Sequence, residues 1–240
     1  MKAFKLHNIR LILILGVLFF LVGFANHRQK SKPVKTLKVE LLDASKIFIT
    51  EVEVEALLNE VLKANGDSLI NENRLATFEN ILDANEMIKS SEAYYTLDGT
   101  LSAKIIQREP IARIRDKGFY YLDAEGLAMP LSANYSSRVP LVSGVSPDEL
   151  KEVYPLLVKI EADDFLKKHI IAIRKKSEKN FVLEVRDREY LVNFGQISYL
   201  DKKLTNYKVF YSKALEYKKL DDYKRIDLQF GNQVVCTTKL

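Results

Sequence analysis

The sequence predicts an α+β protein in which one apolar N-terminal helix precedes two folded domains. Three observations support this prediction: an uncharged apolar run near the N-terminus, a strand-helix-helix-strand-strand order after residue 36, and a change to short strands and turns after Pro110. The first order suits two helices packed on one face of a three-stranded sheet. The later texture predicts a strand-rich β domain with two covering helices.

Basic residues are concentrated ahead of the folded part. The 240 residues carry a formal net charge of +5, and residues 1–35 contain seven of the 37 lysines and arginines and no acidic residue. The remainder therefore holds 30 basic and 32 acidic residues, a formal charge of −2. This distribution argues against a nucleic-acid-binding surface, because phosphate binding depends on clustered positive charge.

The apolar run LILILGVLFFLVGFA predicts a transmembrane helix over residues 9–26. Its fifteen residues fall short of the roughly 20 that span a bilayer, so the run also fits a cleaved signal peptide. Extension back to Leu6 restores the length if the long side chain of Arg10 reaches the head groups. We favour the uncleaved anchor because a basic, proline-containing linker follows at residues 27–36.

Residues 1–8 form the short tail that precedes this anchor. Basic residues flank the run on both sides, so the charge bias alone leaves its orientation open. The side chains expected to anchor the helix in lipid are Leu11, Ile14, Phe19, Phe20 and Phe24.

The first folded domain is predicted from helix caps, periodicity and one hairpin signal. Thr50 and Glu53 have capping-box spacing, and Asp98-Gly99 is a strong hairpin turn. The apolar positions of the second helix are Leu75, Phe78, Ile81 and Leu82. In chain order the domain is expected to contain a strand at 37–43, helices at 51–62 and 73–84, and strands at 87–96 and 101–109, with the turn at 97–99.

The second domain is predicted from short alternating strands and two helix starts. Ser146, Pro147 and Glu149 combine an N-cap, a proline at the first helical position and a third-position acid. Ser198 and Asp201 open a last helix through Tyr217. The expected extended segments are 111–131, 138–144, 170–176, 180–187, 189–195, 224–230 and 233–238, the last two around Gly231-Asn232.

No pattern in the sequence predicts catalysis, a metal site or a cofactor site. The three histidines, His7, His27 and His169, are too scattered to form a ligand set, and glycine-rich phosphate loops are missing. The acidic pairs 163–164 and 221–222 are interpreted as solvated surface, because adjacent residues do not face one site. We therefore expect a binding protein without an active site.

The stretch QREPIARI raises a choice between chemistry and architecture. Arg108 and Glu109 could act as an acid/base pair, whereas Pro110 has no backbone N–H and cannot donate to a sheet ladder. Because such a proline belongs at an edge or a junction, we interpret these three residues as a domain junction, with Pro110 ending the last strand of the first domain.

The end of the chain is the predicted partner-binding site. The last strand pair has almost no sequence after it, so the outermost strand has little chain left to cover its edge. The alternative is an ordinary edge blunted by Lys239, with Phe230 and Val235 in the core. Cys236 is interpreted as a small apolar residue rather than a nucleophile. The candidate partner-binding residues are Gln229, Phe230, Asn232, Val234, Val235, Cys236 and Thr237.

Four motifs in this order resemble the bacterial cell-division family FtsQ/DivIB: QREPIARI, YYLDAEG, VPLVSG and RIDLQF. The resemblance implies a POTRA-type domain at residues 37–110 and a β domain at 111–240. Two departures concern partner recognition, because Gln229-Phe230 stands where the family often has Arg-Tyr and Phe181 where many members have Trp.

The resemblance further implies a non-enzymatic scaffold of the divisome in the cytoplasmic (inner) membrane. Its N-terminus would be cytoplasmic and its large part extracytoplasmic, with FtsB/DivIC-like and FtsL-like partners that link early division proteins to septal peptidoglycan synthesis. An alternative is a POTRA-type chaperone or transport component of the cell envelope. A third reading, an exported enzyme released by signal cleavage, is disfavoured by the lack of a catalytic motif.

Overall fold

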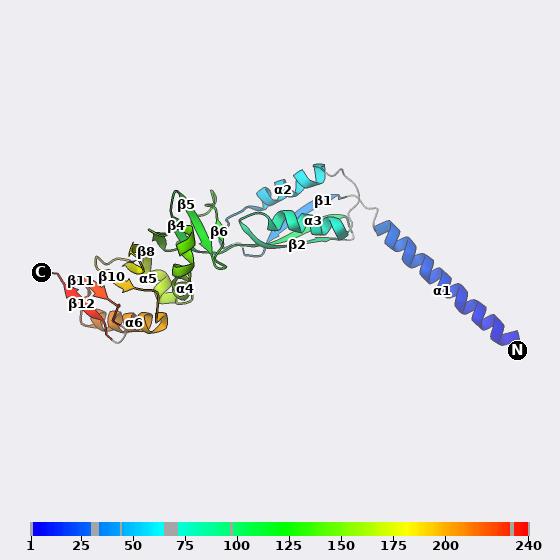
Figure 1. The fold of residues 1–240 in the computed structure, drawn as a ribbon. Helices are drawn as coiled ribbons and strands as arrows, with labels where there is room; N and C mark the ends of the chain where they lie inside the picture. Colours follow the sequence, from blue (N-terminus) through cyan, green and yellow to red (C-terminus); the bar gives the residue numbers. More distant parts are fainter. Residues whose placement is uncertain are drawn as a thin grey trace. The chain divides into compact units, whose positions relative to one another are not determined.

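The computed structural model describes residues 2–29, 34–43, 45–64, 72–96, 98–230 and 233–239 (Figure 1). Its contacts divide the chain into two compact units, one that ends at Gln107 and one that begins at Arg108. The units are considered separately below.

Helix α1 (Lys2–Gln29) contains the apolar run predicted as an anchor. Its described apolar side chains are exposed in every turn, and the exposed fraction reaches 79% at Phe19 and 71% at Phe20. In the described part of the chain, none of the helices meets the combined length and apolarity expected of a membrane span. The helix is therefore confirmed, and its insertion in a membrane stays a prediction.

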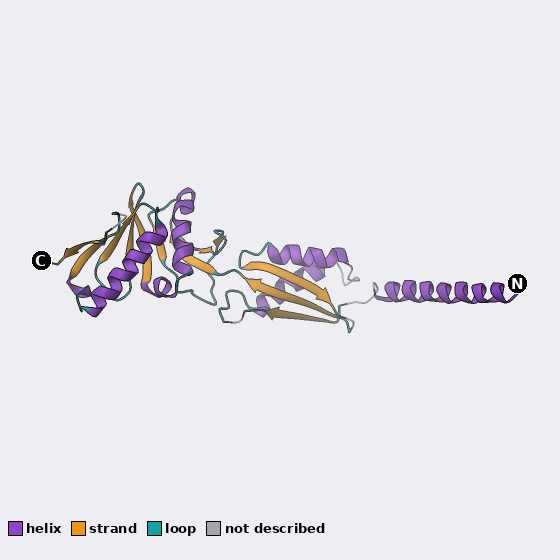
Figure 2. Ribbon diagram, turned by 90° about the horizontal axis from the view of Figure 1, so that it is seen from below, coloured by secondary structure: helices purple, strands orange, loops and turns teal. Residues whose placement is uncertain are grey.

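The first unit has the predicted strand-helix-helix-strand-strand order. Its elements are β1 (Thr36–Leu41), α2 (Glu51–Ala64), α3 (Glu72–Asp83), β2 (Ile88–Tyr95) and β3 (Thr100–Gln107). The sheet order is β1-β3-β2, with β1 parallel to β3 and β2 antiparallel to β3. Parallel strands need a long crossover, which here includes both helices, and the helices share one face of the sheet (Figure 2).

Local signals in the sequence account for the ends of these elements. The backbone N–H of Thr50 donates to Glu53 Oε2 at 2.7 Å and the N–H of Glu53 donates to Thr50 Oγ1 at 3.2 Å, the predicted capping box. Gly99 has φ +101°, a conformation that favours glycine, and the Thr96 N–H bonds Thr100 O across the turn. Leu97, in the same predicted turn, lies outside the described residues.

The core of the first unit is an apolar cluster formed by the two helices and the strands. Val54 and Leu58 of α2 and Phe78 and Leu82 of α3 pack in one buried cluster with the strands. Ile81, predicted to share this face, is instead 36% exposed.

Gln107 ends β3 and ties down the loop between β1 and α2. Its Oε1 accepts the N–H groups of Phe48 and Ile49 at 2.8 and 3.0 Å, and its Nε2 donates to the carbonyls of Asp43 and Lys46, each at 3.1 Å. A buried amide that is fully hydrogen-bonded in this way specifies one loop conformation.

The second unit is built on a nine-stranded sheet, counted over the residues that the structure describes. The strand order is β12-β11-β10-β9-β8-β7-β4-β5-β6. The strands are β4 (Pro110–Arg115), β5 (Phe119–Asp123), β6 (Ala128–Met129), β7 (Leu141–Ser143), β8 (Ile170–Ser177), β9 (Asn180–Val185), β10 (Leu191–Gly195), β11 (Tyr223–Asp227) and β12 (Val235–Thr238).

Helices lie on one face of this sheet, and the prediction of two covering helices is wrong (Figure 2). The described chain has three α-helices here, α4 (Leu150–Glu161), α5 (Asp164–His169) and α6 (Leu200–Glu216), and two 3₁₀ turns, η1 (Pro147–Glu149) and η2 (Leu220–Asp222). The short α5 was missed because Asp163 was interpreted as solvated surface. Its carboxylate instead caps α5, accepting the N–H groups of Phe165 and Leu166 at 3.1 and 3.0 Å.

The N-termini of α4 and α6 differ slightly from the predicted helix starts. Pro147 opens η1, which leads into α4, and the Ser146 N–H donates to Glu149 Oε2 at 3.0 Å. Ser198 does not cap α6: the residue before α6 is Tyr199, which has φ 52° and ψ 39° and gives no side-chain cap.

The QREPIARI stretch is structural in this fold. Strand β3 ends at Gln107 and Pro110 begins β4, so the expectation that Pro110 ends the last strand of the first domain is wrong. Arg108 Nη1 donates to Asp123 Oδ2 at 2.8 Å, and the side chain of Asp123 is 2% exposed. Asp123 Oδ1 also accepts the N–H groups of Glu125 and Leu127, which fixes the turn after β5.

A buried polar network lies between the sheet and α6. His169 Nε2 is 2.7 Å from the hydroxyl of Tyr207, which is 3.0 Å from the hydroxyl of Tyr190. Burial lowers the pKa of His169 to about 4, assisted by the positive charges of Arg188 and Arg186. Burial also raises the pKa of Tyr190 to about 12. The histidine is therefore neutral in the folded protein at neutral pH.

We expect His169 to make the second unit less stable as the pH falls from 6.5 to 4. The unfolded histidine, with a pKa near 6.5, binds a proton in this window that the folded one, with a pKa of about 4, does not. The loss should approach roughly 3 kcal/mol. Urea unfolding of the wild type and of His169→Gln across this window measures it, and equal pH slopes for the two proteins would contradict the expectation.

The predicted separability of the two domains can be tested on a fragment. Residues 34–107 should fold alone, because Gln107 and the buried cluster of the first unit are satisfied within it. Circular dichroism should show a cooperative thermal transition, lowered by Leu58→Ala, which removes about 2–5 kcal/mol of core packing. A gradual, non-cooperative melt would place the boundary elsewhere.

Candidate protein-docking edge of the β domain

The sequence predicted an open edge on whichever strand of the last pair is outermost, and that strand is β12. It pairs only with β11, antiparallel, with Ile226 opposite Cys236 and Asp227 opposite Val235. Its outer side has no neighbour in the described chain. At the other end of the sheet, β6 has two residues. Because strand addition needs a row of backbone groups, β12 is the better template of the two.

Alternation along β12 identifies which backbone groups point outward. The N–H of Lys239 donates to Asp222 O at 2.7 Å, so Lys239 faces β11. Backbone direction alternates along an antiparallel strand, and the register shift between Tyr223 and Arg225 inserts its extra residue in β11 rather than β12. Thr237 and Val235 therefore face β11, whereas Thr238 and Cys236 present their N–H and C=O groups to the open edge.

The side chains beside this edge are partly apolar and accessible. Phe230 is 49% exposed and Val235 is 39% exposed, so the alternative that places both in the core is wrong. Val234 packs against the core, and burial raises the pKa of the half-buried Cys236 thiol, which favours its neutral form. Gln229 is exposed.

Asn232, another candidate residue, lies outside the described residues, as does Gly231 of the same predicted turn. Across that segment the N–H of Gln233 donates to Phe230 O at 3.1 Å.

The β2 edge of the first unit provides a comparison, because side chains bond polar groups along it; we call such an edge guarded. At the β2 edge, Glu79 of α3 accepts the backbone N–H of Ala93 at 2.8 Å, and the hydroxyl of Ser91 bonds Asp83 at 2.8 Å. Over the described residues, no side chain accepts a hydrogen bond from the outward N–H of Cys236 or Thr238. Lys239, the residue expected to blunt the edge, directs its ammonium to Glu189 Oε2 at 2.6 Å. The β12 edge is therefore unguarded in comparison.

The predicted site residues fall in three separate places. The described candidates from Gln229 to Thr237 are contiguous at the β12 edge. The junction residues 108–110 lie at the start of β4, and five strands separate β4 from β12 in the sheet. The anchor residues lie on α1. The outward N–H of Thr238 was missed, because the sequence alone does not give the direction of each backbone group.

The described chain thus combines a strand-helix-helix-strand-strand unit with a strand-rich sheet that has an open terminal edge. The sequence matches the family described as FtsQ/DivIB, C-terminal related, over residues 109–237, which is more than half of the chain. The chain therefore belongs to the FtsQ/DivIB family, whose members are non-catalytic division proteins. No curated protein matched the chain.

Proline substitution should separate the two sides of β12. Val235→Pro removes an N–H that faces β11 and should lower the free energy of unfolding by about 1–3 kcal/mol. Cys236→Pro removes an outward N–H and should cost less, because an edge strand tolerates proline where the missing donor faces solvent. Urea unfolding of both variants tests this order, and a larger loss for Cys236→Pro would reverse the assigned direction.

Proposed function

We propose that this protein is a non-enzymatic, membrane-anchored scaffold of the bacterial divisome that binds a partner by strand addition at β12. The observation that carries the proposal is the unguarded β12 edge beside the exposed Phe230. In strand addition, main-chain hydrogen bonds supply affinity and neighbouring side chains supply specificity. The proposed partners are FtsB/DivIC-like and FtsL-like membrane proteins, as the motif resemblance implies.

The proposed anchor is the segment of residues 9–26 within α1. The helix has 28 residues, about 42 Å at 1.5 Å per residue, against a hydrocarbon layer of about 30 Å. The described side chains of its apolar run are exposed on all sides, which suits a lipid environment. The proposed topology puts residues 1–8 in the cytoplasm and the two folded domains outside it, in the periplasm if the cell has one.

The first unit is proposed to be a POTRA-type domain. A chaperone or transport role for this domain would use its free strand edge on passing chains. The contact of Glu79 with the outward N–H of Ala93 disfavours that use, because a backbone donor of β2 is already occupied.

We expect Phe230→Ala to weaken binding of an FtsB-like partner by about 2 kcal/mol or more, because an exposed aromatic residue beside an added strand acts as a hot spot. Leu127→Ala is the matched control, since Leu127 is also 49% exposed but lies between β5 and β6. Calorimetry on the full chain in detergent micelles measures binding, and circular dichroism measures folding. A folded Phe230→Ala protein that keeps full affinity would exclude this anchor.

Substitutions at Cys236 test whether the partner pairs with the backbone of β12. Cys236→Pro should weaken partner binding more than Cys236→Ala, because only proline deletes the outward N–H. The same calorimetric assay applies, and equal affinities for the two variants would rule out backbone pairing at Cys236.

A further inference from the structure

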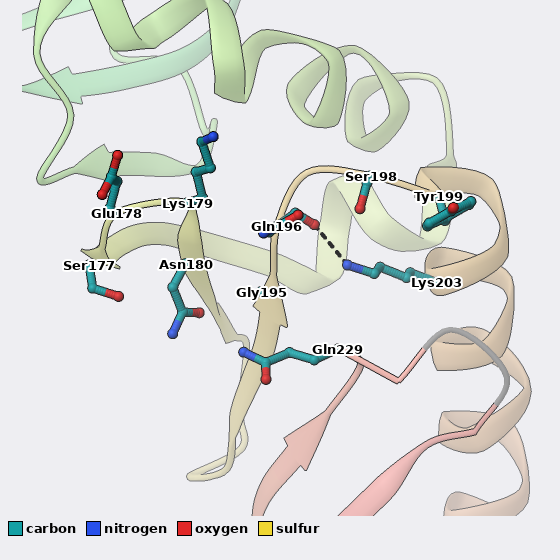
Figure 3. Close-up of a pocket in the computed structure, with 10 residues that line it drawn as sticks. All are labelled: Ser177, Glu178, Lys179, Asn180, Gly195, Gln196, Ser198, Tyr199, Lys203 and Gln229. Atoms are coloured by element: carbon teal, nitrogen blue, oxygen red, sulfur yellow. Dashed lines mark hydrogen bonds between the residues drawn. The ribbon is translucent and has the colours of Figure 1, made fainter.

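A polar cavity of about 540 Å³ lies at one end of the β-domain sheet, and Figure 3 draws the residues that line it. The turn between β8 and β9, the end of β10 and the start of α6 form its walls. Gln229, which follows β11, closes one side. Lys203 projects from the first turns of α6 toward the β10 end (Figure 3).

Lys203 is a buried ammonium group without a carboxylate partner. The residue is 4% exposed, and its Nζ donates to the carbonyls of Phe194 and Gln196 at 2.9 and 2.7 Å. Nζ also lies 4.7 Å from the centre of the Phe194 ring. Among the described carboxylates none forms an ion pair with it, and the nearby Asp227 is engaged by Asn193 Nδ2 and the N–H of Gln229.

Removing an ammonium group from water costs free energy unless hydrogen bonds or an opposite charge compensate the lost hydration. Two carbonyl acceptors use two of the three ammonium hydrogens, which leaves one donor and a full positive charge beside the cavity. Burial lowers the pKa of Lys203 through desolvation. An anion that entered the cavity would complete the hydrogen bonding and offset the desolvation.

The rest of the lining is mixed: Asn180 contributes a buried Oδ1 that has no hydrogen-bond partner among the described residues, so an anion would bind on the Lys203 side of the cavity. Glu178 and Lys179 are both exposed at the rim and carry opposite charges, so Lys203 sets the net sign of the cavity. Ser198 and Gln229 add neutral side chains that can donate hydrogen bonds. A carboxylate matches this set, because it accepts several hydrogen bonds and pairs with one ammonium group.

We propose that this cavity binds a carboxylate, supplied by an aspartate or glutamate side chain of a partner protein. The carboxylate oxygen accepts the free Lys203 N–H while the two carbonyl bonds stay in place. The identification of a protein as the source rests on the proposed scaffold function. The carboxylate chemistry rests on Lys203 and the cavity alone.

The first experiment tests the chemistry without any strand partner. The full chain, labelled with ¹⁵N at its lysine side chains, is titrated in detergent micelles with N-acetylglutamate α-methylamide and, in parallel, with N-acetylglutamine α-methylamide, so that the side-chain carboxylate is the only acid that distinguishes the two probes. We expect a saturable shift of the Lys203 Nζ resonance with the acid, and binding at least about tenfold weaker with the amide. Equal responses to both probes, or no response to the acid, would overturn the site.

Three variants keep this test independent of folding defects. Lys203→Met should abolish the response, whereas Lys179→Met removes an exposed charge at the rim and should leave it within about twofold. If Lys203→Met does not fold, Gln229→Glu provides the second measurement, since it changes an exposed side chain and adds a competing negative charge. Unchanged glutamate binding in Gln229→Glu would count against the cavity.

The second experiment identifies the source of the carboxylate. Each acidic residue of a bound FtsB-like segment is neutralised in turn, and affinity is measured with the wild type and with Lys203→Met. One neutralisation should cost about tenfold with the wild type and nothing with Lys203→Met, the signature of direct coupling. If every neutralisation has the same effect on both proteins, the partner does not supply the carboxylate, although binding at β12 is unaffected by that result.

Discussion

The packing of α6 beneath the sheet is the constraint on which the docking edge depends. Strands β10 and β11 run parallel, so the chain must cross over between them, and α6 is that crossover. Leu204 and Tyr207 of α6 are buried in the same core cluster as Val192 and Ile226 of the two strands. Because β12 pairs only with β11, the edge exists only while this helix holds β11 in register.

The β2 edge of the first unit and the β12 edge of the second differ in whether side chains bond their polar groups. In the first unit, Glu79 and Asp83 of α3 occupy polar groups along β2, and Gln107 fastens the loop beside β3. In the second unit, the polar side chains around β12 are directed elsewhere: Lys239 to Glu189 and Arg188 to Asp221. The contrast is consistent with the proposal that a partner adds a strand at β12.

Features set by neighbouring residues could be predicted from the sequence. The Thr50–Glu53 cap, the turn at Gly99 and the alternation of Phe181 and Leu183 each depend on a few adjacent positions, and each is present.

Features set by distant residues could not be predicted. The cap of α5 is a single Asp163, whose other oxygen bonds Lys208 of α6, and the burial of Lys203 requires carbonyls of β10 and of the loop after it. In the sequence, Lys203 is one of several lysines on an amphipathic helix, which by base rate are solvated. Only the crossover geometry of α6 turns this one inward.

The open edge of β12 also sets a requirement for balanced production of the protein in the cell. Unpaired backbone groups beside an exposed phenyl ring are a template for any extended segment, including β12 of a second copy. Four residues make a short ladder, so self-pairing is weak and reversible, but it grows with concentration. Copies made in excess would therefore be the first to associate with one another, and overproduction would cover the edge that we propose as the partner-binding site.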